Sequence, residues 1–375
     1  MNARAIVLAD SRTAHLRVAA LSLLERLIVA LRRGGCSHIT VVADGPLPDM
    51  ERVRALDIKI DVARVMPSVA DPAVVASTGM LVRAPDVSRV IREDARLVAA
   101  DGTPLPLGVV SRWTQSMVTT PGAAFERALA DRPCVVSDGS ATRVSSPADM
   151  GTATRTFWSS LKSSTDSMLD RFVNRPLCRP LSKLLVHTAV TPNQVSVAAL
   201  AIGLAAAYSF SLATYTSTIV GALLFQLAAV VDCLDGDLAF AVFKESTLGK
   251  WLDITLDQIV HWALFVGIAV AVARTSPETP VVALLASTVI GMLIAFTVVI
   301  RGMLQPPEHR NPTLATLVDT FENRDFSVAL LIFALVGKLE LFLWCAAFGV
   351  HVFWLVALAV QVLSTVRRRP ARESA

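Results

Sequence analysis

A long stretch without charged side chains limits what this chain can fold into. Between Thr188 and Val231 there is no Asp, Glu, Lys or Arg. Because a helix needs about 20 apolar residues to cross a bilayer, this stretch has room for two membrane spans. The chain is 53% hydrophobic and 18% charged, with a mean hydropathy of +0.55, so its apolar and polar residues must lie in separate segments. The sequence therefore predicts an integral membrane protein.

Apolar stretches further along the chain predict an all-α polytopic membrane domain of six transmembrane helices over residues 191–375. The expected spans are 193–212, 216–242, 249–274, 279–302, 325–343 and 346–366. The position of the last turn stays open between two glycines. A turn near Gly337 would place Lys338 and Glu340 at the membrane interface, whereas a turn near Gly349 would place them within a span.

Basic residues gather on one predicted side of this membrane domain. They are Arg171, Arg175, Arg179, Lys183, Lys244, Lys250, Arg301, Arg310, Arg324 and Arg367 to Arg369. Because cytoplasmic loops carry an excess of Lys and Arg, both termini are expected in the cytoplasm, with the protein in the inner (cytoplasmic) membrane. Within a linker of residues 151–190, the segment 167–187 mixes Leu and Phe with Arg and Lys. That pattern predicts a juxtamembrane amphipathic helix that lies at the membrane surface.

Four aspartates lie where the second and third predicted spans approach each other: Asp232, Asp235, Asp253 and Asp257. An ionisable group inside a membrane segment costs roughly 2.5 to 3.5 kcal/mol on insertion scales, so these carboxylates need compensating partners. The spacing places each pair on one face of its own helix. Such oxygen ligands suit Mg²⁺ or Mn²⁺, and two ions would orient a diphosphate. A polar bundle interior or an ion path is the alternative interpretation.

The segment from Asp232 to Asp257 resembles the signature of the CDP-alcohol phosphotransferase family, D-x2-D-G-x2-A-R-x8-G-x3-D-x3-D. The matching residues are Asp232, Asp235, Gly236, Ala239, Gly249, Asp253 and Asp257. The resemblance implies an integral-membrane enzyme that transfers a substituted phosphate from a CDP-linked donor to an alcohol and releases CMP. It also implies that the four aspartates hold two Mg²⁺ or Mn²⁺ ions, and that Asp257 acts in addition as the general base. The cation site and the active site are then on the cytoplasmic side.

The same resemblance implies a pocket for the donor. Thr191–Ser196 is similar to the T-P-N-x-[LV]-[ST] sequence that opens the family's first span. The residues expected to line the pocket are Asn193, Gln194, Val195, Ser196, Gly236, Ala239 and Ser246. Phe240 stands where the family has an Arg that helps to hold the donor's phosphates, and Lys244 is expected to supply a substitute charge one helical turn further on. Arg301 is expected to bind a phosphate on the acceptor, or else to snorkel to the interface.

The first 150 residues predict a separate α/β domain in the cytoplasm. Residues 5–9 and 38–43 read as buried strands, and residues 18–33 have the apolar spacing of a helix that ends at Gly34 and Gly35. A strand, helix and strand of this length predict a parallel crossover and a Rossmann-like sheet.

This N-terminal half resembles the sugar-phosphate nucleotidyltransferases, with two departures. The segment from Asp10 to Arg17 has no glycine, so its backbone cannot wrap a triphosphate as the family's Gly-rich loop does. Thr78 stands where an Asp would bind the metal ion. The domain is therefore expected to be a degenerate, nucleotidyltransferase-like fold without cytidylyltransferase activity.

The order of the two parts resembles the bifunctional proteins that make CDP-inositol and then transfer inositol phosphate. This resemblance implies a donor such as CDP-diacylglycerol or CDP-inositol, an alcohol or inositol-phosphate acceptor, membrane lipid as a partner, and a homodimer. No feature indicates nucleic-acid binding. Two alternatives stay open: a catalytically silent membrane scaffold that senses nucleotide or lipid, and a bifunctional enzyme whose N-terminal domain still makes the donor.

Overall fold

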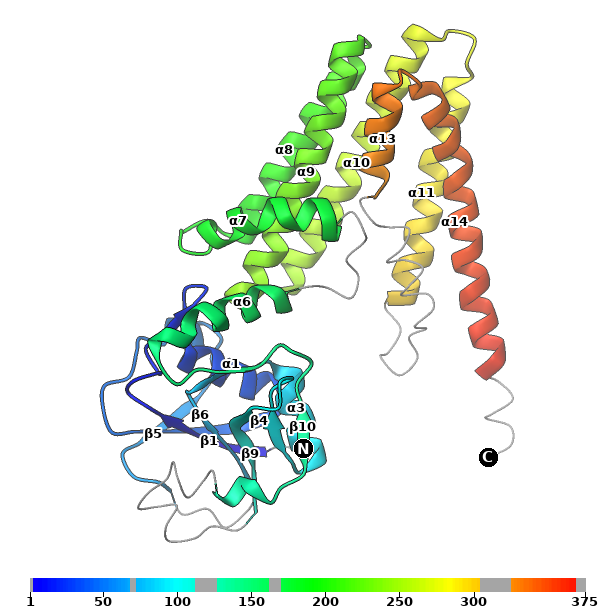
Figure 1. The fold of residues 1–375 in the computed structure, drawn as a ribbon. Coiled ribbons are helices and arrows are strands. Elements are labelled where there is room, and N and C mark those ends of the chain that lie inside the picture. The colour runs from blue at the N-terminus through cyan, green and yellow to red at the C-terminus, as the bar shows by residue number, and fades with distance from the viewer. Residues whose placement is uncertain (1–2, 68–71, 112–126, 162–169, 304–324, 369–375) are drawn as a thin grey trace. The chain divides into compact units, whose positions relative to one another are not determined.

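A parallel strand–helix–strand crossover begins the N-terminal unit, as the sequence predicts. Strands β1 (Ala3–Ala9) and β4 (Cys36–Ala43) pair in parallel, and α1 (Leu23–Arg33) connects them. The computed structural model describes residues 3–67, 72–111, 127–161, 170–303 and 325–368 (Figure 1). Contacts within the chain divide it into two units, Met1–Lys162 and Ser163–Ala375.

The N-terminal unit is built on a seven-stranded mixed sheet with the strand order β10-β8-β9-β6-β1-β4-β5. The remaining strands of this sheet are β5 (Ile60–Ala63), β6 (Ala73–Ser77), β8 (Arg96–Val98), β9 (Pro104–Val110) and β10 (Cys134–Val136). β6 is parallel to β1, whereas β9 runs antiparallel to both β6 and β8. The other elements are α2 (Glu51–Ala55), α3 (Ala84–Glu93), the pair β2 (Arg17–Val18) and β3 (Leu21–Ser22), and the pair β7 (Met80–Leu81) and β11 (Thr142–Arg143).

Residues that the sequence assigns to a linker form helix α6 (Met150–Ser160), which packs on the α/β unit. The Arg26 guanidinium lies 4.2 Å from the centroid of the Phe157 ring. Arg83 donates a hydrogen bond of 3.0 Å to the carbonyl oxygen of Ser160. These contacts explain why the first compact unit extends to Lys162.

The C-terminal unit is helical, and five of its helices are long and apolar enough to cross a membrane. They are α8 (Pro192–Ser211), α9 (Tyr215–Ala241), α10 (Thr247–Thr275), α11 (Val281–Met303) and α14 (Leu339–Arg368). Their most apolar windows have mean hydropathies between 1.5 and 2.5, which is typical of an integral membrane protein.

The last hairpin differs from the expected spans 325–343 and 346–366. Helix α13 (Asp325–Leu335) has only 11 residues, and α14 already begins at Leu339. Gly337 has a φ of +69°, a left-handed conformation that ends a helix at little cost when no Cβ is present. The turn therefore lies at Gly337, the first of the two glycines considered above. A sixth complete span is not seen in the described residues, and residues 304–324 lie outside them.

A helical segment precedes the first span, where the sequence predicts the amphipathic helix. It comprises η2 (Asp170–Asn174), which has π-helical hydrogen bonding, and α7 (Arg175–Leu185). Phe172, Leu177 and Leu184 are exposed over more than half of their surface. An apolar face left uncovered in this way fits a helix that rests on a membrane surface. Residues 167–169 of the expected helix lie outside the described part of the chain.

Helices α8, α9 and α10 approach one another closely because small residues line their contacts. A methyl group at Gly267 of α10 would lie 2.2 Å from the carbonyl oxygen of Ala207 on α8. Phe210, Leu264 and Ile268 are fully buried in the core between these helices. Close packing of small residues is a main source of association between helices in a membrane, and it gives the bundle a rigid centre here.

A directed chain of hydrogen bonds joins α14 to α11. The Trp354 indole donates to Nδ1 of His351 at 2.9 Å, and Nε2 of His351 lies 3.0 Å from the Ser287 hydroxyl. Since an indole N–H can only donate, Nδ1 must accept, and the proton of a neutral His351 is on Nε2. Ser287 in turn donates to the carbonyl oxygen of Ala347 at 3.4 Å. The geometry is that of a structural link between helices, because Nε2 is not free to act as a base toward Ser287.

Candidate functional site

Three of the four predicted metal ligands meet in the helical unit. Asp232 and Asp235 of α9 and Asp253 of α10 each offer a carboxylate oxygen, and these oxygens all lie within 4.8 Å of one another. Asp232 and Asp235 are buried, and Asp253 is half-buried. Grouping carboxylates this closely in a bundle of apolar helices is costly unless a cation compensates their charge.

The donor set of this cluster fits a hard divalent cation. Oδ1 of Asp253 is buried and has no hydrogen-bond partner. A buried acceptor without a donor costs free energy that a bound cation would recover. Carboxylate oxygens, completed by water and phosphate oxygens, are the ligands that Mg²⁺ and Mn²⁺ prefer.

Asp257 does not belong to this group of three. It lies one helical turn beyond Asp253 on α10, where its side chain is half-buried. A carboxylate close to a cation site but outside its nearest oxygens can take a different role from its neighbours.

The opening of α8 holds the cluster in place through Ser196. Its hydroxyl donates a hydrogen bond to Oδ2 of Asp235. Gln194 forms a capping box with Thr191, in which the backbone N–H of Thr191 donates to Oε1 of Gln194 at 2.9 Å. Val195 is buried in the core. Of the predicted donor-pocket residues in this segment, Ser196 therefore reaches the aspartates, Gln194 caps the helix and Val195 packs.

Glycines provide both open space and close approach beside the aspartates. A Cβ at Gly236 would meet nothing within 4 Å, so a ligand can come near the backbone there. A Cβ at Gly249 would lie 3.0 Å from the Ser246 hydroxyl and 3.4 Å from Oδ1 of Asn193. Gly249 thus lets the start of α10 sit against Asn193, while Ser246 caps α10 by accepting from the Gly249 N–H at 2.9 Å.

Lys244 and Arg301, the two basic residues predicted to bind phosphate, are both exposed. Helix α9 ends at Ala241, and Phe243 takes a left-handed conformation with a φ of 56°. Lys244 is therefore in the α9–α10 connection, where it is exposed, just beyond the expected span 216–242. Arg301 is exposed in the last turn of α11. Ala239 and Phe240 are half-buried near the end of α9.

A fifth carboxylate, Asp237, which sequence reasoning missed, joins α7 to α9. Asp237 is 2% exposed and forms an ion pair with Arg175 of α7. The Ser182 hydroxyl donates to Oδ2 of Asp237 at 3.1 Å, and the Cys178 thiol lies 3.7 Å from the same oxygen. The sequence contained a signal for this ion pair. Asp237 is a further carboxylate within the predicted span 216–242, where an ionisable group needs a compensating partner. The ion pair thus attaches α7 to α9 at Asp237, two residues beyond the predicted metal ligand Asp235.

Removing Arg175 is expected to destabilise the helical unit. The Arg175→Ala variant would remove the main counter-charge of the buried Asp237 carboxylate and leave only the weaker interaction with Arg179. Breaking a buried ion pair commonly costs about 3 to 5 kcal/mol. Thermal unfolding of the purified protein in detergent would measure the change. Lys183→Ala removes the same charge from an exposed position of α7 and serves as the matched control. Equal stability of the two variants would contradict a structural role for the pair.

In the N-terminal unit, hydrogen bonds join the segment that follows β1, which begins at Asp10, to Thr78, which follows the neighbouring strand β6. The Thr78 hydroxyl accepts from the backbone N–H of Asp10 at 3.1 Å and lies 2.8 Å from the Thr13 hydroxyl. Thr13 and Thr78 are both buried. These hydrogen bonds tie the start of the loop that follows β1 to the end of β6.

Comparisons with known proteins point to one family for the helical unit. Residues 189–366 match the sequence model of the CDP-alcohol phosphatidyltransferase family. A bifunctional IPC transferase and DIPP synthase of Thermococcus kodakarensis is 34% identical over 111 residues, which cover 30% of this chain and 24% of that protein. An archaetidylinositol phosphate synthase of Pyrococcus horikoshii is 36% identical over 97 residues, which cover 26% of this chain and 50% of that protein. The matches thus span between a quarter and a half of these relatives.

Among solved structures, the phosphatidylinositol phosphate synthase of Mycobacterium tuberculosis with CDP-DAG bound aligns with a TM-score of 0.36. The alignment has 20% sequence identity and covers 51% of this chain and 94% of that chain.

Proposed function

We propose that the CDP-alcohol phosphatidyltransferase domain of residues 189–366 transfers a substituted phosphate from a CDP-linked donor to an alcohol and releases CMP. The observation that carries the proposal is the cluster of the buried Asp232 and Asp235 with the half-buried Asp253, beside the open backbone of Gly236. Three grouped carboxylates next to a glycine that leaves its surroundings open suit a diphosphate held through cations.

Asp232, Asp235 and Asp253 would hold two Mg²⁺ or Mn²⁺ ions in this proposal, and Asp257, one helical turn beyond Asp253 on α10, would share one of them. Such ions neutralise the charge of the donor's diphosphate. Ser196 keeps the Asp235 carboxylate oriented, and Asn193 and Ser246 border the space next to Gly249. Asp257 accepts the proton of the acceptor hydroxyl. The hydroxyl oxygen then forms a bond to the phosphorus next to the donor's alcohol, and the bond from that phosphorus to CMP breaks.

The relatives narrow the choice of substrates. Their names include a DIPP synthase and an archaetidylinositol phosphate synthase, so inositol phosphate is the first acceptor to test. We expect CDP-diacylglycerol or CDP-inositol as the donor. The decisive experiment incubates the full-length protein with each donor and with inositol phosphate, inositol or glycerol phosphate, and measures CMP. No release of CMP with any pair, together with no binding of Mn²⁺, would instead support a silent scaffold.

Orientation and assembly belong to the same proposal. Lys244 and Lys250, which lie between the aspartates of α9 and α10 in the sequence, and Arg301 at the end of α11 support a cytoplasmic position for the active site. Labelling of single cysteines introduced at Ser246 and at Glu278 in intact cells would show which of the two positions faces the cytoplasm.

We expect the protein to form a homodimer. Light scattering of the detergent-solubilised protein would measure its mass and so its oligomeric state.

Lys244 is expected to contribute to donor binding in place of the missing arginine. Lys244→Ala should weaken donor binding, because it removes a positive charge close to the cluster, whereas Phe240→Arg should strengthen it. Titration calorimetry with the donor would measure both affinities, and Glu245→Gln at the neighbouring exposed position is the control. Unchanged donor affinity in Lys244→Ala would remove Lys244 from the pocket.

The N-terminal unit, which we propose to have a nucleotidyltransferase-like fold, is expected not to make CDP-inositol. Thr78 cannot replace a carboxylate as a Mg²⁺ ligand, and its hydroxyl is already used to hold Asp10 and Thr13. The test gives CTP and inositol phosphate to the full-length Asp232→Asn variant, in which any CDP-inositol would accumulate, and measures pyrophosphate. Release of pyrophosphate would make the chain a two-step enzyme.

A further inference from the structure

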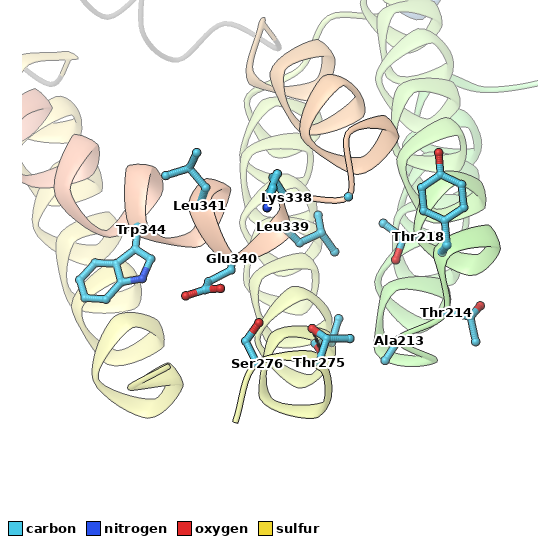
Figure 2. A pocket seen from close by; sticks show the side chains of 13 residues that line it. Ala213, Thr214, Thr218, Thr275, Ser276, Lys338, Leu339, Glu340, Leu341 and Trp344 are labelled. Atoms are coloured by element: carbon cyan, nitrogen blue, oxygen red, sulfur yellow. Dashed lines mark hydrogen bonds between the residues drawn. The ribbon is translucent and has the colours of Figure 1, made fainter. Parts of the chain in front are cut away.

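A second cavity lies at the end of the helical unit opposite the aspartate cluster. The aspartates lie near the end of α9 and the start of α10, whereas this cavity is lined by Tyr215 at the start of α9 and by Thr275 at the end of α10. Its volume is about 620 Å³, within the usual range for small-molecule sites. Figure 2 shows that the start of α14 forms one wall. The position places the cavity where several apolar helices end together.

Two opposite charges line this cavity on the same short segment. Lys338 is exposed, and Glu340 is held by the Thr279 hydroxyl, which donates to its Oε1 at 2.7 Å. Lys338 directly precedes α14 and Glu340 lies in its first turn, and the two opposite charges attract each other. The side chains of Ser276 and Trp344 also donate to Glu340. A carboxylate has about four lone-pair sites, so Glu340 can accept a further hydrogen bond, and an ammonium has three N–H donors. The cavity thus offers a cation and an anion side by side without net charge.

Aromatic and hydroxyl side chains complete the lining. Trp344 and Tyr215 lie at the level where the apolar helices end, which is where aromatic residues contact lipid headgroups. The Tyr215 hydroxyl donates to the carbonyl oxygen of Leu335 at 2.9 Å and closes one side of the cavity. Thr218 and Ser276 add hydroxyl groups to the lining.

From this lining we infer that the cavity binds the headgroup of a zwitterionic phospholipid of the phosphoethanolamine type, in the leaflet opposite the aspartate cluster. The phosphate pairs with Lys338, and the primary ammonium donates to Glu340. A purely anionic headgroup would meet the Glu340 carboxylate, which repels it. A quaternary ammonium has no N–H to donate, so a choline headgroup would leave Glu340 without that hydrogen bond.

Native mass spectrometry of the full-length protein tests this inference. The protein is mixed with equal amounts of phosphatidylethanolamine, phosphatidylcholine and phosphatidylglycerol, and the lipid that stays bound is identified. We expect phosphatidylethanolamine to be retained selectively. Glycerophosphoethanolamine, which has the headgroup without acyl chains, should compete only at much higher concentration. Equal competition by this soluble compound would overturn the assignment to a membrane lipid.

Variants separate the two charges. Lys338→Ala and Glu340→Gln should each lower the affinity for phosphatidylethanolamine by about tenfold, the effect of one charge-assisted hydrogen bond. Glutamine keeps an acceptor for Thr279, so the fold of the segment is maintained. Glu278→Gln removes a carboxylate from an exposed position in the neighbouring α10–α11 connection and should have no effect. Equal retention of all three lipids, or the same affinity in both variants as in the wild type, would overturn the inference.

Discussion

Asp257→Asn is expected to lower the turnover of CDP donor by a factor of about 10² to 10⁴, the usual contribution of a general base. An amide has nearly the shape of a carboxylate but does not accept a proton. Since Asp257 lies outside the group formed by Asp232, Asp235 and Asp253, its loss should leave most of the cation site intact. The measurement is CMP release under saturating donor and acceptor, with donor affinity determined separately by calorimetry.

Turnover and donor affinity, taken together, decide the role of Asp257. A large loss of turnover with donor affinity within about threefold of wild type supports the base. Near-normal turnover would move the base to another residue. Gln258→Ala, at the adjacent half-buried position on α10, controls for local disturbance of the helix.

Asp232→Asn is expected to lower the affinity for Mn²⁺ and for the donor together. Loss of a group that only orients a metal ligand typically costs 10- to 100-fold in metal affinity, so loss of a ligand itself should cost at least about that much. Because the donor would be held through the cations, its binding should fall in parallel. Electron paramagnetic resonance of Mn²⁺ would report the metal, and calorimetry would report the donor.

Asp237→Asn is the matched comparison for this second experiment. It removes a buried carboxylate from the same helix, but one that pairs with Arg175 and does not belong to the cluster. It should lower thermal stability while Mn²⁺ affinity stays close to wild type. The Mn²⁺ affinity of Ser196→Ala is expected to lie between those of the two aspartate variants. This change keeps all the carboxylates and removes only the Ser196 hydroxyl that donates a hydrogen bond to Asp235. Equal Mn²⁺ affinity in Asp232→Asn and wild type would show that the cluster is no cation site.

Features that depend on neighbouring residues could be predicted from the sequence. The charge-free stretch between Thr188 and Val231 predicts two helices in this region, since span length is set by bilayer thickness. The spacing of Asp232 and Asp235 predicts a shared helix face, because the helical period is a local property. For the same reason the first crossover of the N-terminal unit, from β1 through α1 to β4, was predicted correctly.

The tertiary structure alone decided which distant residues meet. Ser196 and Asp235 are 39 positions apart, and Arg175 and Asp237 are 62 apart. Such contacts depend on how helices pack against each other, and the packing here follows from small residues such as Gly267 that no periodic pattern identifies as contacts. The structure likewise grouped three aspartates and left Asp257 apart, and it placed the last turn at Gly337. Helical periodicity by itself determines the face on which a side chain lies, whereas the residue it meets there is determined by the packing of the whole bundle.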